Sequence, residues 1–263
     1  MSDADMLNGG STMPTNPIRF QPNGLRGTDL AIWDPVLIDE AADVLPTQRG
    51  ELFYEDEASG VSVGIWESTP FTGVMAPYPV HEFMIVLEGA VTIITKAGDR
   101  TVIEAGQSFL LPKGLECRWH QDVPVKKYFM IFDKQDEQGI TSPAPSLVVD
   151  GAAPLSSIAV NPSDPLLGPP PVLHARTAFE NATGAWRIGV WQTGPYHRSK
   201  GPFPRYELMH ILEGEASITD QRGNVETYGP GETLFIPKGT ECNFLVGEHL
   251  RKIYCILDLR GPA

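Results

Sequence analysis

The sequence predicts an all-β protein that contains two tandem barrels of short antiparallel strands. Its 263 residues include 26 Gly and 24 Pro, a proportion well above the average for globular proteins, and this favours tight turns over long helices. Apolar residues alternate with a period of two, and the segments FMIVLEGAVTIIT and LMHILEGEASIT each break at a Glu-Gly turn, as hairpins do. An internal repeat sets the number of barrels at two.

The repeat relates the two halves of the chain at one offset of 125 residues. Four pairs of segments align without gaps: 63–70 with 188–195, 76–89 with 201–214, 105–117 with 230–242, and 127–133 with 252–258. Such a register over about 70 residues indicates a duplicated domain.

Composition also suggests the domain boundaries. Residues 134–171 are rich in Pro and are expected to connect a first barrel, residues 31–133, to a second barrel, residues 172–263. Residues 1–30 are rich in Gly, Asn, Ser and Pro, so we expect a flexible N-terminal arm.

Charge and hydropathy exclude several classes of partner. The chain has 20 Lys and Arg against 33 Asp and Glu, a net charge of −13, which argues against nucleic acid as a partner. It contains no apolar run of the roughly 18 residues that a membrane span requires, and no signal peptide pattern. Three widely spaced Cys do not form a disulfide framework. We therefore expect a cytoplasmic protein without a membrane partner.

Two spaced motifs resemble those of the cupin superfamily. The first motif, Glu followed by six residues and Gly, is present at Glu82 and Gly89 and again at Glu207 and Gly214. The second motif, Gly-x5-Pro-x-Gly, is present at 106–114 and at 231–239. More specifically, the chain resembles the cupin subgroup named after (S)-ureidoglycine aminohydrolase. The resemblance implies two jelly-roll barrels that pack as an internal pseudo-dimer, but it does not specify the reaction.

The positions of the cupin metal ligands depart from the family pattern. Metal-binding cupins have a His-x-His before the Glu and a further His after the second motif. The matching positions are Ala76, Tyr78 and Cys117 in the first barrel, and Gly201, Phe203 and Cys242 in the second. Each barrel thus keeps one carboxylate and one thiol, fewer than the three ligands of a typical catalytic site. We expect no bound metal, no cofactor and no transfer of the namesake activity.

In the cupin geometry, Glu82 and Glu207 point into the barrels. A buried carboxylate needs a partner, and both repeats place a lysine on a late strand, at Lys127 and Lys252. Each lysine either pairs with the Glu or lies on the outer face of the sheet. The thiol of Cys242 is either a nucleophile or an inert packing residue.

One loop distinguishes the two copies. Residues 194–207 contain His197, Arg198, Lys200 and Arg205, whereas the matching loop of the first barrel has neither Lys nor Arg. A basic rim at a barrel mouth attracts carboxylates and phosphates; the alternative is an ordinary solvated loop. The loop favours the second barrel as the functional one and a structural role for the first.

These observations predict a bicupin that binds a small polar anionic metabolite in a metal-free second barrel, with or without converting it. An enzyme would use Glu207 as acid or base and Cys242 in the pocket. The residues expected to contact the ligand are His197, Arg198, Lys200, Arg205, Phe203, Met209 and Lys252, and the matching first-barrel positions are Tyr78, Glu82, Cys117 and Lys127.

Two other functions are considered. The alternative is a non-catalytic ligand-binding or regulatory bicupin whose barrels are filled by aromatic and Met side chains. A third, less favoured function is a metal-dependent aminohydrolase of the ureidoglycine type. The sequence does not specify the ligand, and it is compatible with a homodimer.

Overall fold

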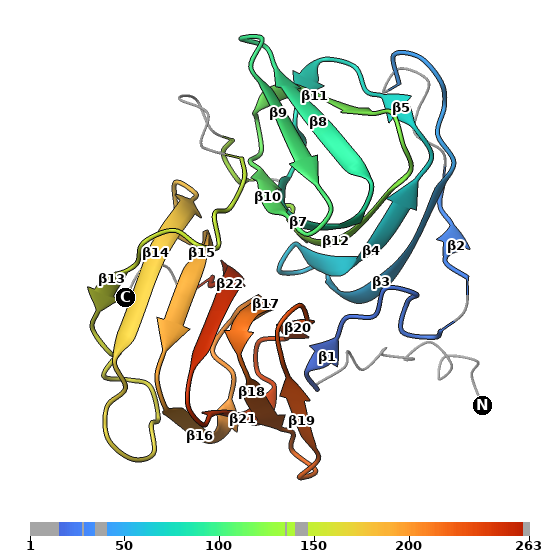
Figure 1. Cartoon of the computed structure of the whole chain (residues 1–263). Coiled ribbons are helices and arrows are strands. Elements are labelled where there is room, and N and C mark those ends of the chain that lie inside the picture. The colour runs from blue at the N-terminus through green and yellow to red at the C-terminus, as the bar shows by residue number, and fades with distance from the viewer. Residues whose placement is uncertain (1–15, 28, 35–40, 135, 140–146, 260–263) are drawn as a thin grey trace, which may run out of the picture.

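The computed structural model describes residues 16–27, 29–34, 41–134, 136–139 and 147–259. All regular elements in these ranges are β-strands, and they form two barrels of two sheets each (Figure 1). The predicted all-β architecture with two tandem barrels is confirmed. No helix among the described residues is long and apolar enough to cross a membrane.

The first barrel pairs a large sheet with a smaller one. The large sheet has the order β10-β7-β12-β4-β3-β2 and contains β2 (Ala31–Ile32), β3 (Gln48–Asp56), β4 (Val61–Ser68), β7 (His81–Glu88), β10 (Ser108–Leu111) and β12 (Val125–Phe132). The smaller sheet has the order β5-β11-β8-β9, with β6 also paired to β11, and contains β5 (Phe71–Thr72), β6 (Ala76–Pro77), β8 (Ala90–Thr95), β9 (Arg100–Glu104) and β11 (Glu116–Gln121).

The second barrel repeats this arrangement. Its large sheet has the order β1-β20-β17-β22-β15-β14-β13 and contains β1 (Ile18–Arg19), β13 (Ser156–Ile158), β14 (Leu173–Glu180), β15 (Trp186–Thr193), β17 (Tyr206–Gly214), β20 (Thr233–Ile236) and β22 (Leu250–Leu257). Its smaller sheet has the order β16-β21-β18-β19 and contains β16 (Tyr196–Pro202), β18 (Ala216–Thr219), β19 (Val225–Tyr228) and β21 (Glu241–Val246).

The glycines of the first motif are required by their turns. Gly89 and Gly214 have φ angles of +80° and +71°, a region that residues with a side chain rarely adopt. A Cβ atom would lie 2.1 Å from the carbonyl oxygen of Pro124 at Gly89, and 1.9 Å from that of His249 at Gly214. The glycine of the motif is therefore required by the backbone conformation of the turn in both copies.

The segments that precede the barrels are exchanged between them. Strand β1 precedes the first barrel but pairs with β20 of the second, with Ile18 opposite Phe235 (Figure 1). Conversely, Val148 precedes the second barrel and forms a bridge with Phe109 of the first. The segment before each barrel therefore pairs with a strand of the other barrel.

The exchange corrects the expectation of a flexible arm over residues 1–30 for the part that is described. Residues 1–15 and 28 lie outside the described residues. Ile18, Phe20 and Leu30 are buried in the hydrophobic core, because they cover apolar surface between the two barrels.

The two barrels share one hydrophobic core along their contact. Tyr54 of the first barrel lies 5.3 Å from the ring of Phe235 in the second, and Phe132 stacks on Trp186 across the same contact at 5.8 Å. Trp186 is among the largest fully buried side chains of the described residues. The pseudo-dimer is thus held together by core packing.

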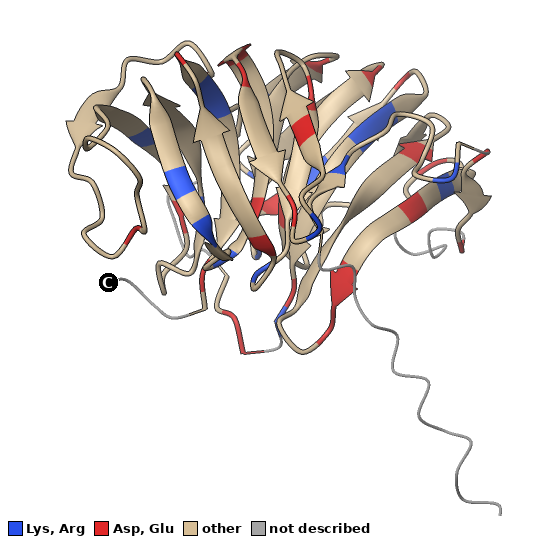
Figure 2. Cartoon of the chain, turned by 90° about the horizontal axis from the view of Figure 1, so that it is seen from below, with Lys and Arg blue, Asp and Glu red and all other residues tan. Residues whose placement is uncertain are grey.

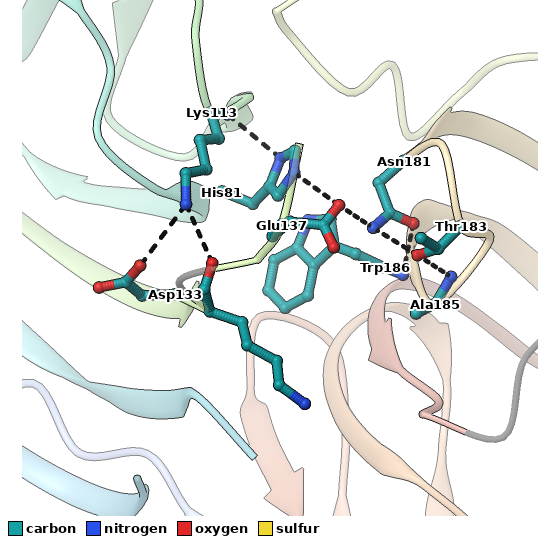
Figure 3. Close-up of polar contacts among 9 residues, drawn as sticks. His81, Lys113, Asp133, Glu137, Asn181, Thr183, Ala185 and Trp186 are labelled. Atoms are coloured by element: carbon teal, nitrogen blue, oxygen red, sulfur yellow. Dashed lines mark hydrogen bonds and ion pairs between the residues drawn. The ribbon is translucent and has the colours of Figure 1, made fainter. Parts of the chain in front are cut away.

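A chain of polar contacts also crosses between the barrels (Figure 3). His81 Nδ1 accepts a hydrogen bond from the Lys113 backbone N–H at 3.2 Å, while its Nε2 lies 3.5 Å from Glu137 Oε1. Asn181 Nδ2 donates to the same Glu137 oxygen at 2.6 Å, and Asn181 Oδ1 accepts from the Trp186 backbone N–H at 2.9 Å. Burial lowers the pKa of His81, partly offset by the attraction of Glu137, so the imidazole is neutral in this network.

This network predicts a loss of stability in mild acid. The pKa of His81 is lower in the folded chain than its ordinary value of 6.5, so below pH 6.5 the unfolded chain binds a proton that the folded chain does not. The contribution to stability is complete above pH 6.5 and falls as the pH drops toward the folded pKa, by at most about 1.4 kcal/mol per pH unit. His81→Gln removes this proton, so its unfolding free energy, measured in urea between pH 7.5 and 5, should decrease less steeply than that of the unmodified protein. Burial lowers the pKa of His210 to about 4. This residue is present in both the unmodified protein and the variant, so its effect cancels in the comparison. Parallel curves would contradict the prediction.

Candidate functional site

Each barrel contains one buried Glu–Lys ion pair at the same place. Lys127 Nζ lies 2.6 Å from Glu82 Oε1, and Lys252 Nζ lies 2.7 Å from Glu207 Oε1. The glutamates stand on β7 and β17 and the lysines on the neighbouring strands β12 and β22. The two orientations that the sequence allowed for these lysines are thereby resolved in favour of the pair.

The lysines are enclosed by matching side chains in the two copies. Lys127 Nζ lies 4.9 Å from the ring of Trp66, 5.0 Å from that of Trp119 and 3.0 Å from Met84 Sδ. In the second barrel, Lys252 Nζ has the equivalent contacts with Trp191 at 4.8 Å, Phe244 at 5.3 Å and Met209 Sδ at 3.1 Å. Aromatic faces stabilise an ammonium group that has lost its hydration, and a carboxylate provides the counter-charge.

The third partner of the Glu differs between the barrels. In the first barrel, the Tyr78 hydroxyl donates a hydrogen bond to Glu82 Oε2. In the second barrel, Arg205 Nε and Nη2 each lie 3.0 Å from Glu207 Oε2. The polar group of the first barrel is therefore neutral, whereas that of the second has two cations for one carboxylate.

The charges around Glu207 determine its protonation. Burial raises the pKa of Glu207, but the attraction of Lys252 and Arg205 outweighs it and leaves the pKa below its ordinary value. Burial also lowers the pKa of Lys252, against the opposing attraction of Glu207. Glu207 is therefore an ionised carboxylate at neutral pH.

The side chains of Glu207, Lys252 and Arg205 lie in the wall of a cavity of about 250 Å³. The apolar part of the wall includes Trp191, Tyr196, Phe203, Met209, Phe244 and Tyr254, and the charged part comprises Asp164, Glu180, Arg187, Arg198, Arg205, Glu207 and Lys252. Four cations face three carboxyl groups, and burial raises the pKa of Asp164. The cavity is therefore cationic in a chain whose net charge is −13 and whose Asp and Glu residues are spread over strands and loops (Figure 2).

Arg187 is a cavity residue that the sequence reasoning missed. Its side chain comes from β15, on the same face as Trp191, and its Nε is buried without a hydrogen-bond partner. The available signal was the repeat, since Arg187 aligns with the small, neutral Ser62 of the first barrel. A buried donor without a hydrogen-bond partner lowers the stability of the fold unless a further group accepts its hydrogen bond.

The basic loop divides between the cavity and the surface. Arg205 and Arg198 line the cavity, and Arg198 Nη2 also donates to the Pro202 carbonyl oxygen at 2.7 Å. His197 and Lys200, which are expected from the sequence to contact the ligand, do not line this cavity. Lys200 is exposed, and its Nζ donates to the Gln221 carbonyl oxygen at 3.0 Å.

Cys242 also lies outside the cavity. Its side chain is completely buried among the apolar residues of the second barrel, and burial raises its pKa to about 11. The placement of Cys242 in the pocket is therefore corrected, and the side chain packs as a small apolar residue. Cys117 borders the first-barrel cavity, but burial raises its pKa to about 11 as well.

The cupin metal positions do not form a metal site here. Among the described residues, no group of three or more His, Cys, Asp and Glu side chains is placed to hold a metal ion. His81 packs against Phe132, and His210 contacts Thr233, both on the outer faces of the strands that carry the glutamates. The donors that remain with Glu207 are cationic nitrogens, which repel a metal ion.

Two tandem jelly-roll barrels with an inward Glu at the first motif define the class of the protein as a bicupin. The chain belongs to the family described as the EutQ-like cupin domain, whose model matches residues 55–129 and 180–254, more than half of the sequence. No curated protein matches it. The (S)-ureidoglycine aminohydrolase subgroup is not established by these matches.

Solved structures agree with the fold. A protein of unknown function from Pseudomonas syringae pv. tomato, of the DUF861 family, aligns with a TM-score of 0.73 at 23% identity over 92% of this chain and 99% of that chain. A putative dioxygenase from Nostoc punctiforme aligns at 0.57 and 13% identity over 95% and 86%. Protein Ylba from E. coli aligns at 0.52 and 11% over 98% and 97%. At these identities the similarity concerns the fold alone.

Proposed function

We propose that this bicupin binds a small organic anion in the cavity of its second barrel. The observation that carries the proposal is the excess of cations around Glu207, where Lys252 and Arg205 share one carboxylate. A carboxylate or phosphate group of the ligand would restore the charge balance and supply acceptors for the free N–H groups of the guanidinium ions. Arg187 Nε is one such donor.

The dimensions of the cavity restrict the ligand further. About 250 Å³ is less than the roughly 300 Å³ at which pockets for drug-sized ligands begin, so the ligand is a compact metabolite. The aromatic walls formed by Trp191, Tyr196 and Phe203 suit a short apolar segment next to the anionic group.

Binding is better supported as the role of this site than catalysis by Glu207 or Cys242. Glu207 cannot donate a proton at neutral pH, because its pKa lies below the ordinary value and general acids need a pKa near the working pH. A thiol with a pKa of about 11 provides almost no thiolate at neutral pH. The anion site is accordingly proposed as a recognition site of the bicupin.

The test is a titration with small anions and two variants that copy the first barrel. Acetate, malonate, succinate and inorganic phosphate are titrated by calorimetry, and thermal shifts are recorded in parallel. Arg205→Val and Arg187→Ser introduce the residues that the first barrel has at the matching positions, Val80 and Ser62. We expect at least one anion to bind and each variant to weaken its Kd about ten- to hundredfold, the usual effect of losing a charge-assisted contact.

Lys200→Met provides the matched control, since Met75 occupies this position in the first barrel. Lys200 belongs to the same loop but lies outside the cavity, so its variant should retain the affinity. The proposal fails if none of the four anions binds, or if Lys200→Met weakens binding as much as Arg205→Val does.

A further inference from the structure

The first barrel encloses a larger cavity with a different wall. Its volume is about 510 Å³, within the range of pockets that bind small organic molecules. The wall contains six aromatic side chains, which are Trp33, Trp66, Phe71, Tyr78, Trp119 and Phe129. This cavity is separate from the anion site proposed above.

The Glu82–Lys127 ion pair of this cavity already has its partners. Glu82 Oε1 accepts a hydrogen bond from Lys127, and Oε2 accepts one from Tyr78. Lys127 is enclosed between the rings of Trp66 and Trp119. Neither Glu82 nor Lys127 therefore requires a ligand of opposite charge.

The arginines of the second cavity have no counterpart in the first. The repeat aligns Arg187, Arg198 and Arg205 with Ser62, Gly73 and Val80. Arg118 borders the first cavity, and its Nε is buried without a hydrogen-bond partner. It stands between Cys117 and Trp119, however, and alternation along β11 directs its side chain to the face opposite Trp119. The two copies thus differ in the charge that they offer a ligand.

Two glutamines hold the tryptophan rings of the first cavity. Trp66 Nε1 donates to Gln48 Oε1 at 2.8 Å, and Trp119 Nε1 donates to Gln121 Oε1 at 2.7 Å. The rings stand at 83° to each other with centroids 6.0 Å apart. They form two fixed, nearly perpendicular walls, and preformed walls reduce the entropic cost of binding.

These glutamines are specific to the first barrel. The matching positions of the second barrel are Leu173 and Val246, which cannot accept a hydrogen bond. The fixed tryptophan walls are therefore not inherited from the shared fold but are a feature of this copy.

We infer that the first barrel is a second binding site, for an uncharged planar aromatic or heteroaromatic molecule. Such a molecule stacks on one indole face and presents its edge to the other. It needs no counter-ion, in keeping with the closed Glu82–Lys127 pair. The inference extends the proposed function to a second ligand class, but it does not depend on that proposal.

The experiment uses benzamide and indole as neutral probes and benzoate as the charged counterpart of benzamide. Calorimetry gives the affinities of the full-length protein. Proton–nitrogen spectra resolve the indole N–H signals of the five Trp in the chain. We expect benzamide to shift the signals of Trp66 and Trp119, to leave that of Trp186 in the shared core in place, and to bind at least tenfold more tightly than benzoate at this site.

Variants locate the site. The double substitution Trp119→Phe with Gln121→Val copies the second barrel, which has Phe244 and Val246 there, and should weaken benzamide binding about tenfold. Arg205→Val in the second barrel should leave it unchanged. If the double variant fails to fold, the spectra of the unmodified protein decide the matter.

Three results would overturn the inference. The first is the absence of Trp66 and Trp119 shifts with both neutral probes, and the second is equal affinity for benzoate and benzamide at these residues. The third is loss of benzamide binding in Arg205→Val alone. Failure of the anion titration would refute only the proposal for the second barrel, since its readout involves other residues and other probes.

Discussion

Replacement of Lys127 by Met should lower the free energy of unfolding by about 3–5 kcal/mol. The side chains of Lys127 and Glu82 are only 8% and 6% exposed, so the substitution leaves a buried carboxylate that keeps the hydrogen bond from the Tyr78 hydroxyl. Removing one partner of a buried ion pair typically costs this much, because the other charge stays desolvated. Urea denaturation monitored by circular dichroism measures the loss.

A neighbouring lysine supplies the control. Lys126 lies on the outer face of the same strand, 3.1 Å from Glu67, and the two side chains are 16% and 32% exposed. An ion pair that solvent reaches contributes about 0–1 kcal/mol. Lys126→Met should therefore have a small effect. A loss below about 1 kcal/mol for Lys127→Met would show that the pair is not buried as described.

The double variant Lys127→Met with Glu82→Gln should recover most of the lost stability, since it removes both charges together. The matching double variant of the second barrel, Lys252→Met with Glu207→Gln, should recover much less. There the Arg205 guanidinium remains near the cavity wall without its carboxylate. Equal recovery in both barrels would contradict the assigned difference in charge.

Phe20→Ala is expected to cost about 3–5 kcal/mol, the usual loss for a buried Phe. The ring of Phe20 contacts Phe53 at 4.9 Å and Tyr128 at 5.0 Å in edge-to-face geometry. Phe20 also extends the exchanged strand β1, because its N–H donates to the Thr233 carbonyl oxygen at 2.9 Å. The variant therefore loosens the contact between the two barrels.

Unfolding in urea measures this loss as well, with Ile32→Ala as the control. Ile32 lies in the same N-terminal region but is 70% exposed, so its truncation should change the stability by less than about 0.5 kcal/mol. Similar values for the two variants would mean that residues 18–20 do not hold the barrels together.

Much of the fold could be predicted from the sequence because its signals are local or repeated. Turn glycines such as Gly89 and Gly214 are required by their own backbone angles, and the alternation of apolar residues is a property of each strand. The ungapped repeat extends these local signals to a pair of equal barrels. The exchange of β1 escaped prediction, since Ile18 and Phe235 are opposite each other without any local signal that joins them.

The candidate site was predictable in part. The inward glutamates follow from the motif, and the contrast between Arg205 and Val80 follows from the repeat. Arg187 was missed because a lone Arg in a strand carries no signal of its own, and Lys200 was included because the whole loop is basic. The composition of a loop shows that it is basic. Only the position of each side chain in the structure shows which of its cations line the cavity.

By itself the sequence determined the duplication, the strand-rich architecture, the positions of the two glutamates and the loss of the cupin metal ligands. The tertiary structure alone decided that Lys127 and Lys252 face those glutamates, that Cys242 is buried away from the cavity, and that the two cavities differ in charge. The physical reason is strand pairing. The register shifts by one residue next to both lysines, and such a bulge redirects a side chain. Only the paired partner strand specifies where the bulge falls.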